Sequence, residues 1–533
     1  MVQRRTVVAG GAALGLLGAA GLSRQLRSPA PRVPRTGGTL VVAPAGEPAM
    51  LVSAFDSTMT NCIIGSKILE GLVTYDVDLN PVPALAESWD IARDGKTVRL
   101  ALRRGVTWHD GRDFTAEDVA FTLQKVWREL HPFGHAVYDN VETVITPDPH
   151  SLILRLSAPA AYLFAFLNSY GAQVLPRHIY EGTDIRANPA NLAPIGTGPF
   201  RFDRWDRGSH IRLTRNPHYW RTGQPALDEV IYRFIPDAAA RTAALQAGEV
   251  DLAPGNAIPL LSLHRFADSD RFELNRDEGR FLSTIGLVIV NVRHGPLADP
   301  RVRRALLHAI DREALIRLVY RGYGKVATGP IPSSVKRYYS DDVAHYPYDP
   351  ARAAALLDEA GLHPGADGIR LTLRMDFAST DSLRQVQFLR QTLGKLGIRI
   401  ILRSQDFLGF LRQVFTEQDF DLAVSGLHML PDPTLGVQRL YWSKNIRKGV
   451  PWTNGSGYVN RELDAIMEQA QHEGDDTLRK ALIKRWQQIV QTDLPVLNLV
   501  EVQWISVNAA RLSRPSRQGD GLFDTLGDAR FVS

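Results

Sequence analysis

The segment Pro194–Phe200, PIGTGPF, carries two glycines one residue apart, a spacing found in loops that bind phosphate groups. A dinucleotide-binding loop needs a third glycine three residues later, between a strand and a helix. Arg201 occupies that third position, and Pro199 disfavours a helix that starts there. The following residues, FRFDRW, predict a strand. We therefore interpret the two glycines as a turn leading into a strand rather than as a phosphate site.

Other patterns that could carry catalysis or hold a metal are scarce. The chain contains neither the Gly-x-Ser-x-Gly nucleophile motif nor the His-Glu-x-x-His zinc motif. His131 and His135 have a spacing that could suit a metal ion, but histidines in such a loop are more often only polar. Residues 108–111, WHDG, could pair an acid with a base, yet they fall where a turn is expected. Cys62 is the only cysteine, which excludes an intrachain disulfide and a cysteine zinc cluster. We therefore expect no catalytic residue, no metal site and no cofactor.

The elements that would position these residues alternate irregularly between strands and helices. Apolar residues alternate through 97–103, as in a half-buried strand. Residues 114–130 predict a helix, in which Thr115 and Asp118 have the capping-box spacing. Further helices are predicted at 299–322, 349–361, 381–397 and 476–491, and a buried strand at 493–504. The pattern is that of a mixed α/β protein with more than one lobe.

Length and charge narrow the class of protein. With 533 residues, of which 44% are hydrophobic and 22% charged, the chain is globular and too long for a single ordinary core. Its net charge of +5 would by itself suggest nucleic acid as a partner. However, residues 1–37 hold six of the 62 basic residues and none of the 57 acidic ones. The rest of the chain is close to neutral, so we expect no nucleic-acid partner.

The N-terminus has the features of an export signal. A short basic start is followed by an apolar stretch from Val7 to Leu22, which is shorter than the roughly 20 residues of a membrane-spanning helix. Arg4 and Arg5 directly before it resemble a twin-arginine signal, and an uncleaved membrane anchor is the alternative. A linker rich in proline and arginine follows. We therefore assign residues 1–37 to a signal and linker and expect an exported protein.

Nine stretches, taken in order, resemble one family: the extracytoplasmic solute-binding proteins of ABC importers, in the peptide/nickel group known as family 5. They are ILEGLVTYD (68–76), PALAESW (83–89), LRRGVTWHDGRDFTAEDVAFT (102–122), PIGTGPF (194–200), NPHYW (216–220), ALQAGEVDLA (244–253), PLADPRVRRALLHAIDREALI (296–316), YDPARAAALLDEAG (348–361) and YVNRELDAIMEQA (458–470). The resemblance covers roughly residues 38–510. It implies binding of a solute, with no catalytic role for any residue.

The resemblance also implies a fold: α/β, of the type II-like periplasmic-binding-protein kind, with two lobes, a hinge and an extra inserted domain. The expected segments are 38–72, 196–280 and 496–533 for lobe I, 73–195 for the inserted domain, and 281–495 for lobe II. The chain would cross between the lobes near 281–291 and 495–501. A ligand would bind between the lobes, and the closed form would be recognised by a membrane permease. We expect a monomer located in the periplasm.

Peptide-binding members of the family typically hold the carboxylate of their ligand with an arginine. Arg384 matches that arginine of dipeptide-binding relatives, counted back from residues 395–397. On the predicted helix it lies on the polar side, so an ordinary solvated arginine is the alternative. The helix dipole opposes a cation in the first turn by about 0.3–1 kcal/mol, which a bound anion would offset. Both interpretations stay open.

The same relatives hold the ligand amine with an aspartate that precedes an acidic residue and a proline. In residues 425–437, SGLHMLPDPTLGV, Met429 occupies that place and Asp432 is the acid of the pair itself. Asp432 either caps a helix that starts at Pro433, which we favour, or contacts the ligand. The missing aspartate makes His428 and Met429 candidate contacts for another ligand, such as a modified peptide, an opine-like conjugate, a metal chelate or an oligosaccharide.

Three further residues are weaker candidates for the cleft between the lobes. Thr60 and Asn61 precede the first helix of lobe I, and Trp442 follows the Asp432 segment; each is more often structural. We predict a substrate-binding protein of an ABC importer that captures a small peptide or peptide-like solute and delivers it to a permease. The alternatives are a binding protein without a permease and an enzyme on the same scaffold, which would need a nucleophile beside a base.

Overall fold

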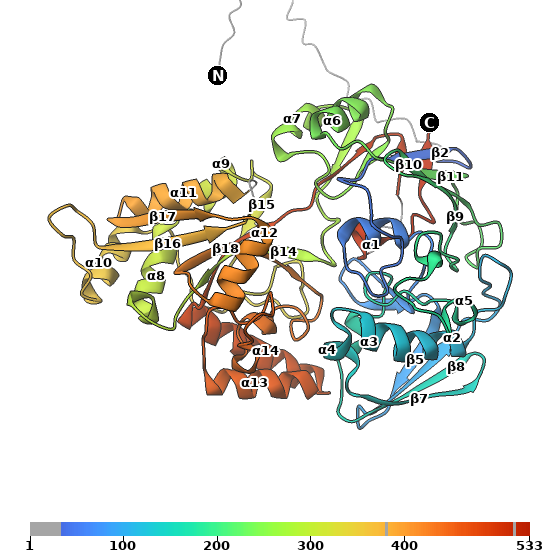
Figure 1. Cartoon of the computed structure of the whole chain (residues 1–533), viewed down its shortest axis with the longest axis horizontal. Helices are drawn as coiled ribbons and strands as arrows, with labels where there is room; N and C mark the ends of the chain where they lie inside the picture. Colours follow the sequence, from blue (N-terminus) through green and yellow to red (C-terminus); the bar gives the residue numbers. More distant parts are fainter. Residues whose placement is uncertain (1–33, 379–381, 515–518) are drawn as a thin grey trace, which may run out of the picture.

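A computed structural model describes residues 34–378, 382–514 and 519–533. The chain forms two lobes that lie side by side and are joined by two crossing segments (Figure 1). Both lobes mix helices with sheets, so the predicted α/β class is confirmed. The predicted twin-arginine signal, before residue 34, lies outside the described residues. Within the described ranges, no helix is both long and apolar enough to cross a membrane.

Lobe I is built on a seven-stranded sheet of strand order β13-β20-β12-β2-β11-β10-β9. The strands are β2 (Thr39–Val42), β9 (Phe200–Asp206), β10 (His210–Arg215), β11 (Glu229–Arg233), β12 (Leu252–Ala253), β13 (Phe272–Asn275) and β20 (Ser506–Ala509). They come from three separate stretches of the chain. The sheet is complete only when β20, near the C-terminus, pairs between β12 and β13.

Smaller elements complete this side of the molecule. Helix α1 (Met59–Gly65) lies within the core of lobe I, and α6 (Ala238–Ala247) and α7 (His264–Ala267) pack together beside its sheet. A three-stranded sheet near the C-terminus consists of β1 (Pro34–Arg35), β21 (Leu512–Ser513) and β22 (Arg530–Val532). β3 (Val73–Tyr75) pairs with β4 (Pro81–Pro83).

A four-stranded antiparallel sheet, of order β5-β6-β8-β7, lies within the segment 73–195 that we expected to form an inserted domain. Its strands are β5 (Ala86–Ile91), β6 (Thr97–Leu102), β7 (Val141–Asp148) and β8 (Ser151–Leu156). The predicted helix 114–130 is confirmed as α2 (Ala116–Phe121), the π-turn η1 (Thr122–Trp127) and α3 (Arg128–Leu130) in succession. The Asp118 carboxylate accepts a hydrogen bond from the Thr115 backbone N–H at 2.9 Å, as the capping box predicts.

Lobe II is a six-stranded sheet of order β15-β19-β14-β18-β16-β17, covered by helices on both faces. Its strands are β14 (Ser283–Val290), β15 (Gly324–Val326), β16 (Leu371–Phe377), β17 (Ile398–Ser404), β18 (Leu422–Met429) and β19 (Val496–Val502). One face packs on α8 (Pro300–Ala309), α9 (Arg312–Leu318), α10 (Pro350–Glu359) and α11 (Leu383–Gly394). The other packs on α12 (Phe407–Leu411), α13 (Arg461–His472) and α14 (Asp476–Asp493).

Burial on both faces explains why the central strands are apolar throughout. In β14, Val288 and Val290 belong to one core cluster, whereas Leu287 and Ile289 belong to the other. Successive side chains of a strand point to opposite faces, so a strand between two helical layers needs apolar residues at every position. The buried strand predicted at 493–504 is β19, which is confirmed as a central strand of this sheet.

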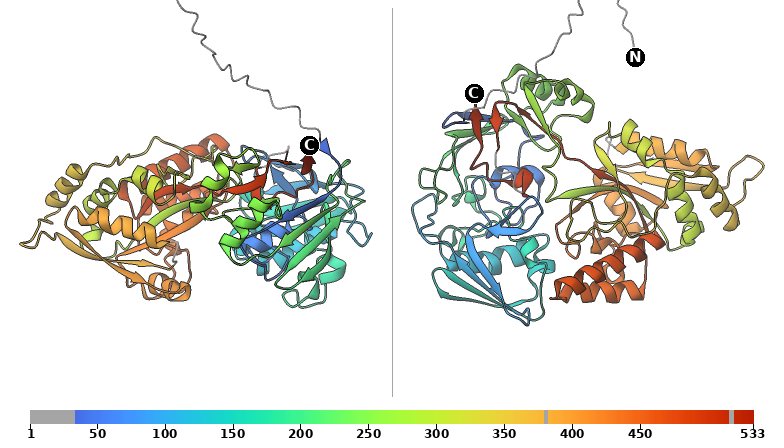
Figure 2. Two further views of the ribbon diagram at one scale, coloured as in Figure 1. Left: turned by 90° about the horizontal axis from the view of Figure 1, so that it is seen from above. Right: turned by 180° about the vertical axis from the view of Figure 1, so that it is seen from behind.

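The predicted crossing points between the lobes are wrong by several residues. β14 and β19 were expected to cross, but both are strands of the lobe II sheet, where they pair with each other. The crossings are therefore residues 276–282, between β13 and β14, and residues 503–505, between β19 and β20 (Figure 2). The expected boundary between lobe II and lobe I at 495/496 is wrong for the same reason. Local hydrophobicity does not reveal which sheet a strand joins.

The helix expected at 299–322 is two helices. Asp299 caps α8 as predicted, since its side chain accepts from the Arg301 backbone N–H, but α8 ends at Ala309. Asp311 then caps α9 by accepting from the Ala314 backbone N–H. A second N-cap inside an apolar periodic stretch was the signal for this break.

The PIGTGPF segment joins the segment 73–195, expected to form an inserted domain, to β9 of lobe I. The Gly198 N–H donates to the Ile68 carbonyl at 2.9 Å, and a Cβ on Gly198 would lie 2.7 Å from the carbonyl oxygens of Lys67 and Ile68. His109 of WHDG accepts from the Gly196 N–H and bonds the Gly198 carbonyl at 2.9 Å. The glycines thus allow close backbone packing, and the predicted turn before a strand is confirmed.

Candidate ligand-binding site

Polar residues gather at the edge of the lobe II sheet that faces lobe I. There β14 begins, β18 ends and β19 ends, because β14 runs antiparallel to both neighbours. Thr284 of β14 pairs with His428 of β18 and with Val502 of β19, so these side chains share one face. In open α/β sheets, ligands bind beyond the carboxyl ends of the strands. This edge of the lobe II sheet is therefore the candidate ligand site.

His428, a predicted site residue, is held at this edge by two partners. Its Nδ1 lies 2.8 Å from the Thr284 hydroxyl, which also accepts from the Trp504 indole N–H at 2.9 Å. The Thr284 hydroxyl therefore joins His428 to Trp504, and its oxygen accepts from the indole N–H, which can only donate. The rings of His428 and Trp504 lie 5.7 Å apart. Desolvation, and after it the charge of Arg439, lower the pKa of His428 to about 4. The imidazole is exposed at this end of the sheet.

Arg439 lies close to His428 and was not predicted. It belongs to the short helix η8 (Gln438–Leu440), and its guanidinium carbon lies 5.6 Å from the centre of the Phe133 ring, in the segment that we expected to form an inserted domain. Its Nε is buried without a hydrogen-bond partner in the described part of the chain. Burial lowers the pKa of Arg439 to about 10, opposed by the Tyr170 hydroxyl. The side chain thus reaches from lobe II toward the inserted domain.

Met429 and Asp432 lie on the same segment but face the interior. Met429 is 2% exposed and lines a small apolar cavity with Ile331, Val335 and Val437. Asp432 is 3% exposed, and its carboxylate binds the Arg479 guanidinium at 2.7 and 3.0 Å.

The same carboxylate accepts from the backbone N–H and the hydroxyl of Thr434, at 3.0 and 2.7 Å. Asp432 therefore caps the turn after Pro433, and the sequence favoured capping over ligand contact. The predicted α-helix at Pro433 is not formed, because the described backbone makes turns there.

The remaining predicted residues are dispersed. Arg384 is exposed in the first turn of α11, directly after residues 379–381, which the structure does not describe. Trp442 donates its indole N–H to Glu468 of α13 at 3.1 Å. In lobe I, Asn61 is buried and accepts from the Ala49 N–H at 3.2 Å, while Thr60 is partly exposed. Of the seven predicted residues, His428, Met429 and Asp432 lie together on one segment, and of these three only His428 is exposed.

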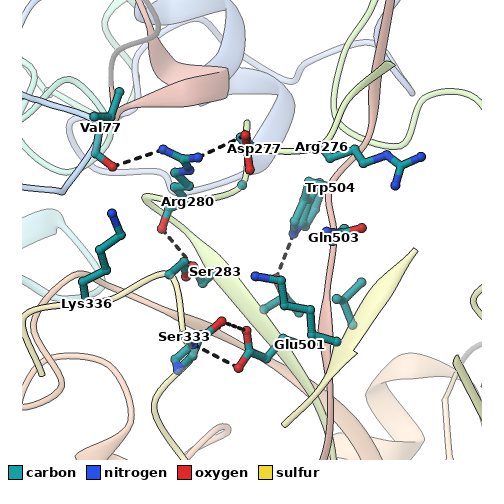
Figure 3. Close-up of a pocket in the computed structure, with 16 residues that line it drawn as sticks. Val77, Arg276, Asp277, Arg280, Ser283, Ser333, Lys336, Glu501, Gln503 and Trp504 are labelled. Carbon is teal, nitrogen blue, oxygen red and sulfur yellow. Dashed lines mark hydrogen bonds and ion pairs between the residues drawn. The ribbon is translucent and has the colours of Figure 1, made fainter. Parts of the chain in front are cut away.

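A pocket of about 170 Å³ lies beside the crossings (Figure 3). Arg280 donates to the Val77 carbonyl at 3.2 Å and pairs with Asp277 at 3.0 Å. Glu501 accepts from the backbone N–H and the hydroxyl of Ser333. Small-molecule sites usually measure roughly 300–1,000 Å³, so this pocket is the space beside the hinge rather than a complete ligand site.

Comparison with known proteins decides the family. The model of the bacterial extracellular solute-binding proteins, family 5, matches residues 80–449, which is more than half of the chain. The chain belongs to this family. Family 5 proteins bind solutes, which agrees with the expected role in solute binding.

Individual relatives support the two-lobe fold of this family 5 protein. The glutathione-binding protein GsiB of Salmonella choleraesuis is 27% identical over 486 residues, covering 89% of this chain and 91% of GsiB. The substrate-binding protein CtaP of Listeria monocytogenes aligns with a TM-score of 0.80 and 25% identity, over 93% of this chain and all of CtaP. The oligopeptide-binding protein AppA of Bacillus subtilis, in complex with a nonapeptide, aligns with a TM-score of 0.75 and 25% identity, over 94% and 100%.

Sequence reasoning missed three residues of the site: Thr284, Trp504 and Arg439. The first two lie where crossings meet the sheet, which became clear only with the strand pairing. Arg439 did leave a signal. It stands in an apolar segment, and no acidic residue occurs between Asp432 and Glu462. A cation with no acidic neighbour in sequence is a candidate for binding an external anion.

His131, considered above as a metal ligand, is instead a buried neutral side chain. Its Nδ1 accepts from the Phe133 N–H at 3.1 Å, and its ring contacts Phe166 edge-on at 5.0 Å. His135 is exposed and pairs with Asp139. The two histidines therefore do not face a common ion, and within the described residues no cluster of metal-ligating side chains occurs.

The buried His131 predicts a stability difference that depends on pH. Burial lowers the pKa of His131 to about 3, whereas an unfolded histidine titrates near 6.5. The unfolded chain therefore binds the extra proton first, and stability falls as the pH drops from about 6.5 toward 3. His131→Phe should lose less unfolding free energy between pH 7 and pH 4 than the wild type, measured by urea denaturation. His135→Phe controls for the added ring, and equal losses in His131→Phe and wild type would contradict the assignment.

Proposed function

We propose that this protein is the extracytoplasmic substrate-binding component of an ABC importer that captures a peptide-like solute between its lobes. The observation that carries the proposal is the contact of one lobe II segment with the other side of the cleft. Leu430 and Leu435 pack into the core cluster of lobe I and the inserted domain, and Arg439 lies over Phe133. Such contacts form when the lobes close, and a bound solute would stabilise the closed form.

The relatives, and one departure of this chain from the family pattern, indicate the class of solute. GsiB is a glutathione-binding protein and AppA was solved with a nonapeptide, which supports a peptide-like ligand. However, Asp432 is the only acidic residue of the segment 428–440, and Arg479 already pairs with it. The segment thus lacks a free carboxylate for a ligand amine. This observation favours, as the second candidate, an anionic solute without a free amine at that end, such as an opine-like conjugate.

Two measurements test the proposed function. Mass spectrometry of small molecules released from the natively purified protein should find a solute. A panel of di- and tripeptides, glutathione, amino acid conjugates, metal chelates and oligosaccharides should include compounds that raise the thermal midpoint. A ligand at a hundred times its Kd stabilises by about 2.7 kcal/mol. A panel without any shift, together with protein that releases no solute, would refute the role.

Arg384 stays the predicted carboxylate anchor at the start of α11. Its side chain is exposed, and among the described residues it forms no ion pair. Arg384→Ala should weaken the binding of a carboxylate ligand from the panel by about 1.5–3 kcal/mol, the range of hydrogen bonds to charged groups. Isothermal calorimetry checks this value, and unchanged affinity would remove Arg384 from the site.

We place the mature protein in the periplasm, working with a membrane permease as a monomer. The twin arginines Arg4 and Arg5 support export by the twin-arginine route. Cell fractionation of a strain that lacks the twin-arginine translocase tests the route. Normal periplasmic accumulation in that strain would contradict it.

A further inference from the structure

We propose that Arg439 binds an anionic group of the solute, a carboxylate or a group of like geometry, and so makes closure of the lobes depend on the charge of the ligand. The inference deepens the proposed function and rests on it. It assigns a specificity-determining role to a residue that no sequence pattern of the family pointed to. Four observations support the proposal: the unpaired Nε of Arg439, its position between the lobes, the aromatic and neutral groups around it, and the contrast with other arginines.

The contrast with the most buried arginines is the clearest of these observations. Arg241, Arg303 and Arg479 all have acceptors inside the protein. Arg303 donates to the carbonyl oxygens of Leu297, Ala298 and Asp493, Arg241 to those of Ile235, Pro236 and Ala257, and Arg479 to Asp432 and the Ala470 carbonyl. In the described part of the chain, the Arg439 guanidinium has no such acceptor, and its Nε is buried and unpaired. Arg439 as a whole is partly exposed, but its Nε is buried, and buried polar atoms of a cation are normally paired because desolvating a charge is costly.

The position of Arg439 links its charge to closure. The residue follows a segment in which Leu430 and Leu435 already pack against lobe I and the inserted domain. The guanidinium lies over Phe133, which belongs to the inserted domain, while its backbone belongs to lobe II. Opening the lobes would return Arg439 to water. Closing them desolvates it.

Within the described ranges, the surroundings of Arg439 supply no counter-charge. The titratable groups that face Arg439 are the Tyr170 hydroxyl and the His428 imidazole. Tyr170 is 5% exposed and packs against Phe166, Phe281 and Phe523, so the surroundings on this side of Arg439 are aromatic. Face contact with Phe133 attracts a cation weakly and leaves the N–H groups in the ring plane free to donate. A carboxylate is the ligand group that matches a guanidinium with two parallel hydrogen bonds.

Closure without an anion therefore buries an uncompensated charge, whereas closure around an anion buries a pair. A ligand shifts a conformational equilibrium only by its differential affinity for the two states. An anionic group at Arg439 interacts mainly in the closed state and supplies that difference. A solute with the same shape but without the charge would bind the open lobes without closing them.

Calorimetry with charged and neutral forms of one probe tests the proposal. Trialanine and glutathione are each compared with their C-terminal amides, in the wild type, Arg439→Gln and Arg390→Gln. Arg390 is exposed on α11 and serves as the matched control. The wild type and the control should prefer the acid by about ten- to a hundredfold, the range expected for a charged hydrogen bond. In Arg439→Gln that preference should fall by about tenfold or more, and any remainder is the contribution of Arg384. A preference that is unchanged in Arg439→Gln, or that is absent from the wild type, would overturn the proposal.

A second measurement needs no ligand and separates this inference from the proposed function. If Arg439 binds an external anion, it has no partner in the unliganded protein. Arg439→Gln should then leave the thermal midpoint of the unliganded protein unchanged or raise it, because an unpaired charge is removed. If Arg439 is instead a structural residue, the variant should be destabilised as strongly as Arg479→Gln, and the inference fails. In a third outcome, the wild type binds none of the four probes and Arg439→Gln does not change the thermal midpoint. This outcome would exclude these peptides as solutes and would leave Arg439 as an anion site.

Discussion

Replacing Arg479 by methionine should lower the free energy of unfolding of lobe II by about 3–5 kcal/mol, the cost of breaking a buried ion pair from one side. Arg479 is 1% exposed, and its guanidinium binds both oxygens of Asp432, the Tyr338 hydroxyl and the Ala470 carbonyl. Methionine fills a similar volume but leaves the Asp432 carboxylate buried without a counter-charge. Since Asp432 begins the segment that leads to Arg439, the site should lose its shape together with its stability.

Two further variants isolate the charge from the loss of packing. Arg479→Met combined with Asp432→Asn removes both charges and keeps an oxygen for the Thr434 N–H, so it should recover most of the loss. Arg485→Met, on the same helix α14, breaks an exposed pair with Glu462 and should cost at most about 0.5 kcal/mol. Urea denaturation followed by circular dichroism measures all three. If Arg479→Met were no more harmful than Arg485→Met, the buried pair would not be a structural anchor.

Replacing Gly196 by alanine should cost about 1–3 kcal/mol or more of stability, the range found when a well-packed region receives an extra methyl group. A Cβ at this position would overlap the Ile68 carbonyl oxygen, which belongs to the backbone and cannot rotate away. Gly196 is also held from the other side, because its N–H and its carbonyl both bond His109. The strain would separate the inserted domain from lobe I where PIGTGPF joins them.

A matched glycine provides the control for this variant. Gly46 has no atom within 4 Å of the place where a Cβ would stand, so Gly46→Ala should change the stability little. The two variants are compared by their denaturation midpoints and by protease sensitivity of the junction near residue 196. Equal midpoints for Gly196→Ala and Gly46→Ala would show that the backbone contact is looser than the structure indicates.

Much of the fold could be predicted because its signals are local. The capping box of Thr115 and Asp118, the N-cap of Asp299 and the apolar alternation of 97–103 each involve residues within a few positions of one another. The break at Asp311 was missed although its signal was equally local, because apolar periodicity continued through it. The crossings were misplaced for another reason. β14 and β19 look alike whichever sheet they join, and only their pairing assigns them to lobe II.

The candidate site was harder to predict, because the role of each of its residues depends on which other residues contact it. Asp432 has the same sequence context whether it binds a solute or Arg479, which lies 47 residues later. Met429 is an apolar residue that packs into the core, as its chemistry allows, although it occupies the place of the family's aspartate. His428 stays a predicted contact of the ligand; alternation along β18 places its exposed side chain on the opposite side from the buried Met429.

The sequence by itself determined the fold class, the family, most helix ends and the neutrality of the folded body, because propensity, capping and apolar period act over short distances. The tertiary structure alone decided which charges are satisfied. Arg479 and Arg439 are both arginines in largely apolar surroundings, yet one meets a carboxylate across the fold and the other meets aromatic rings and a neutral imidazole. That difference arises from contacts between residues far apart in the chain, which no short stretch of sequence encodes.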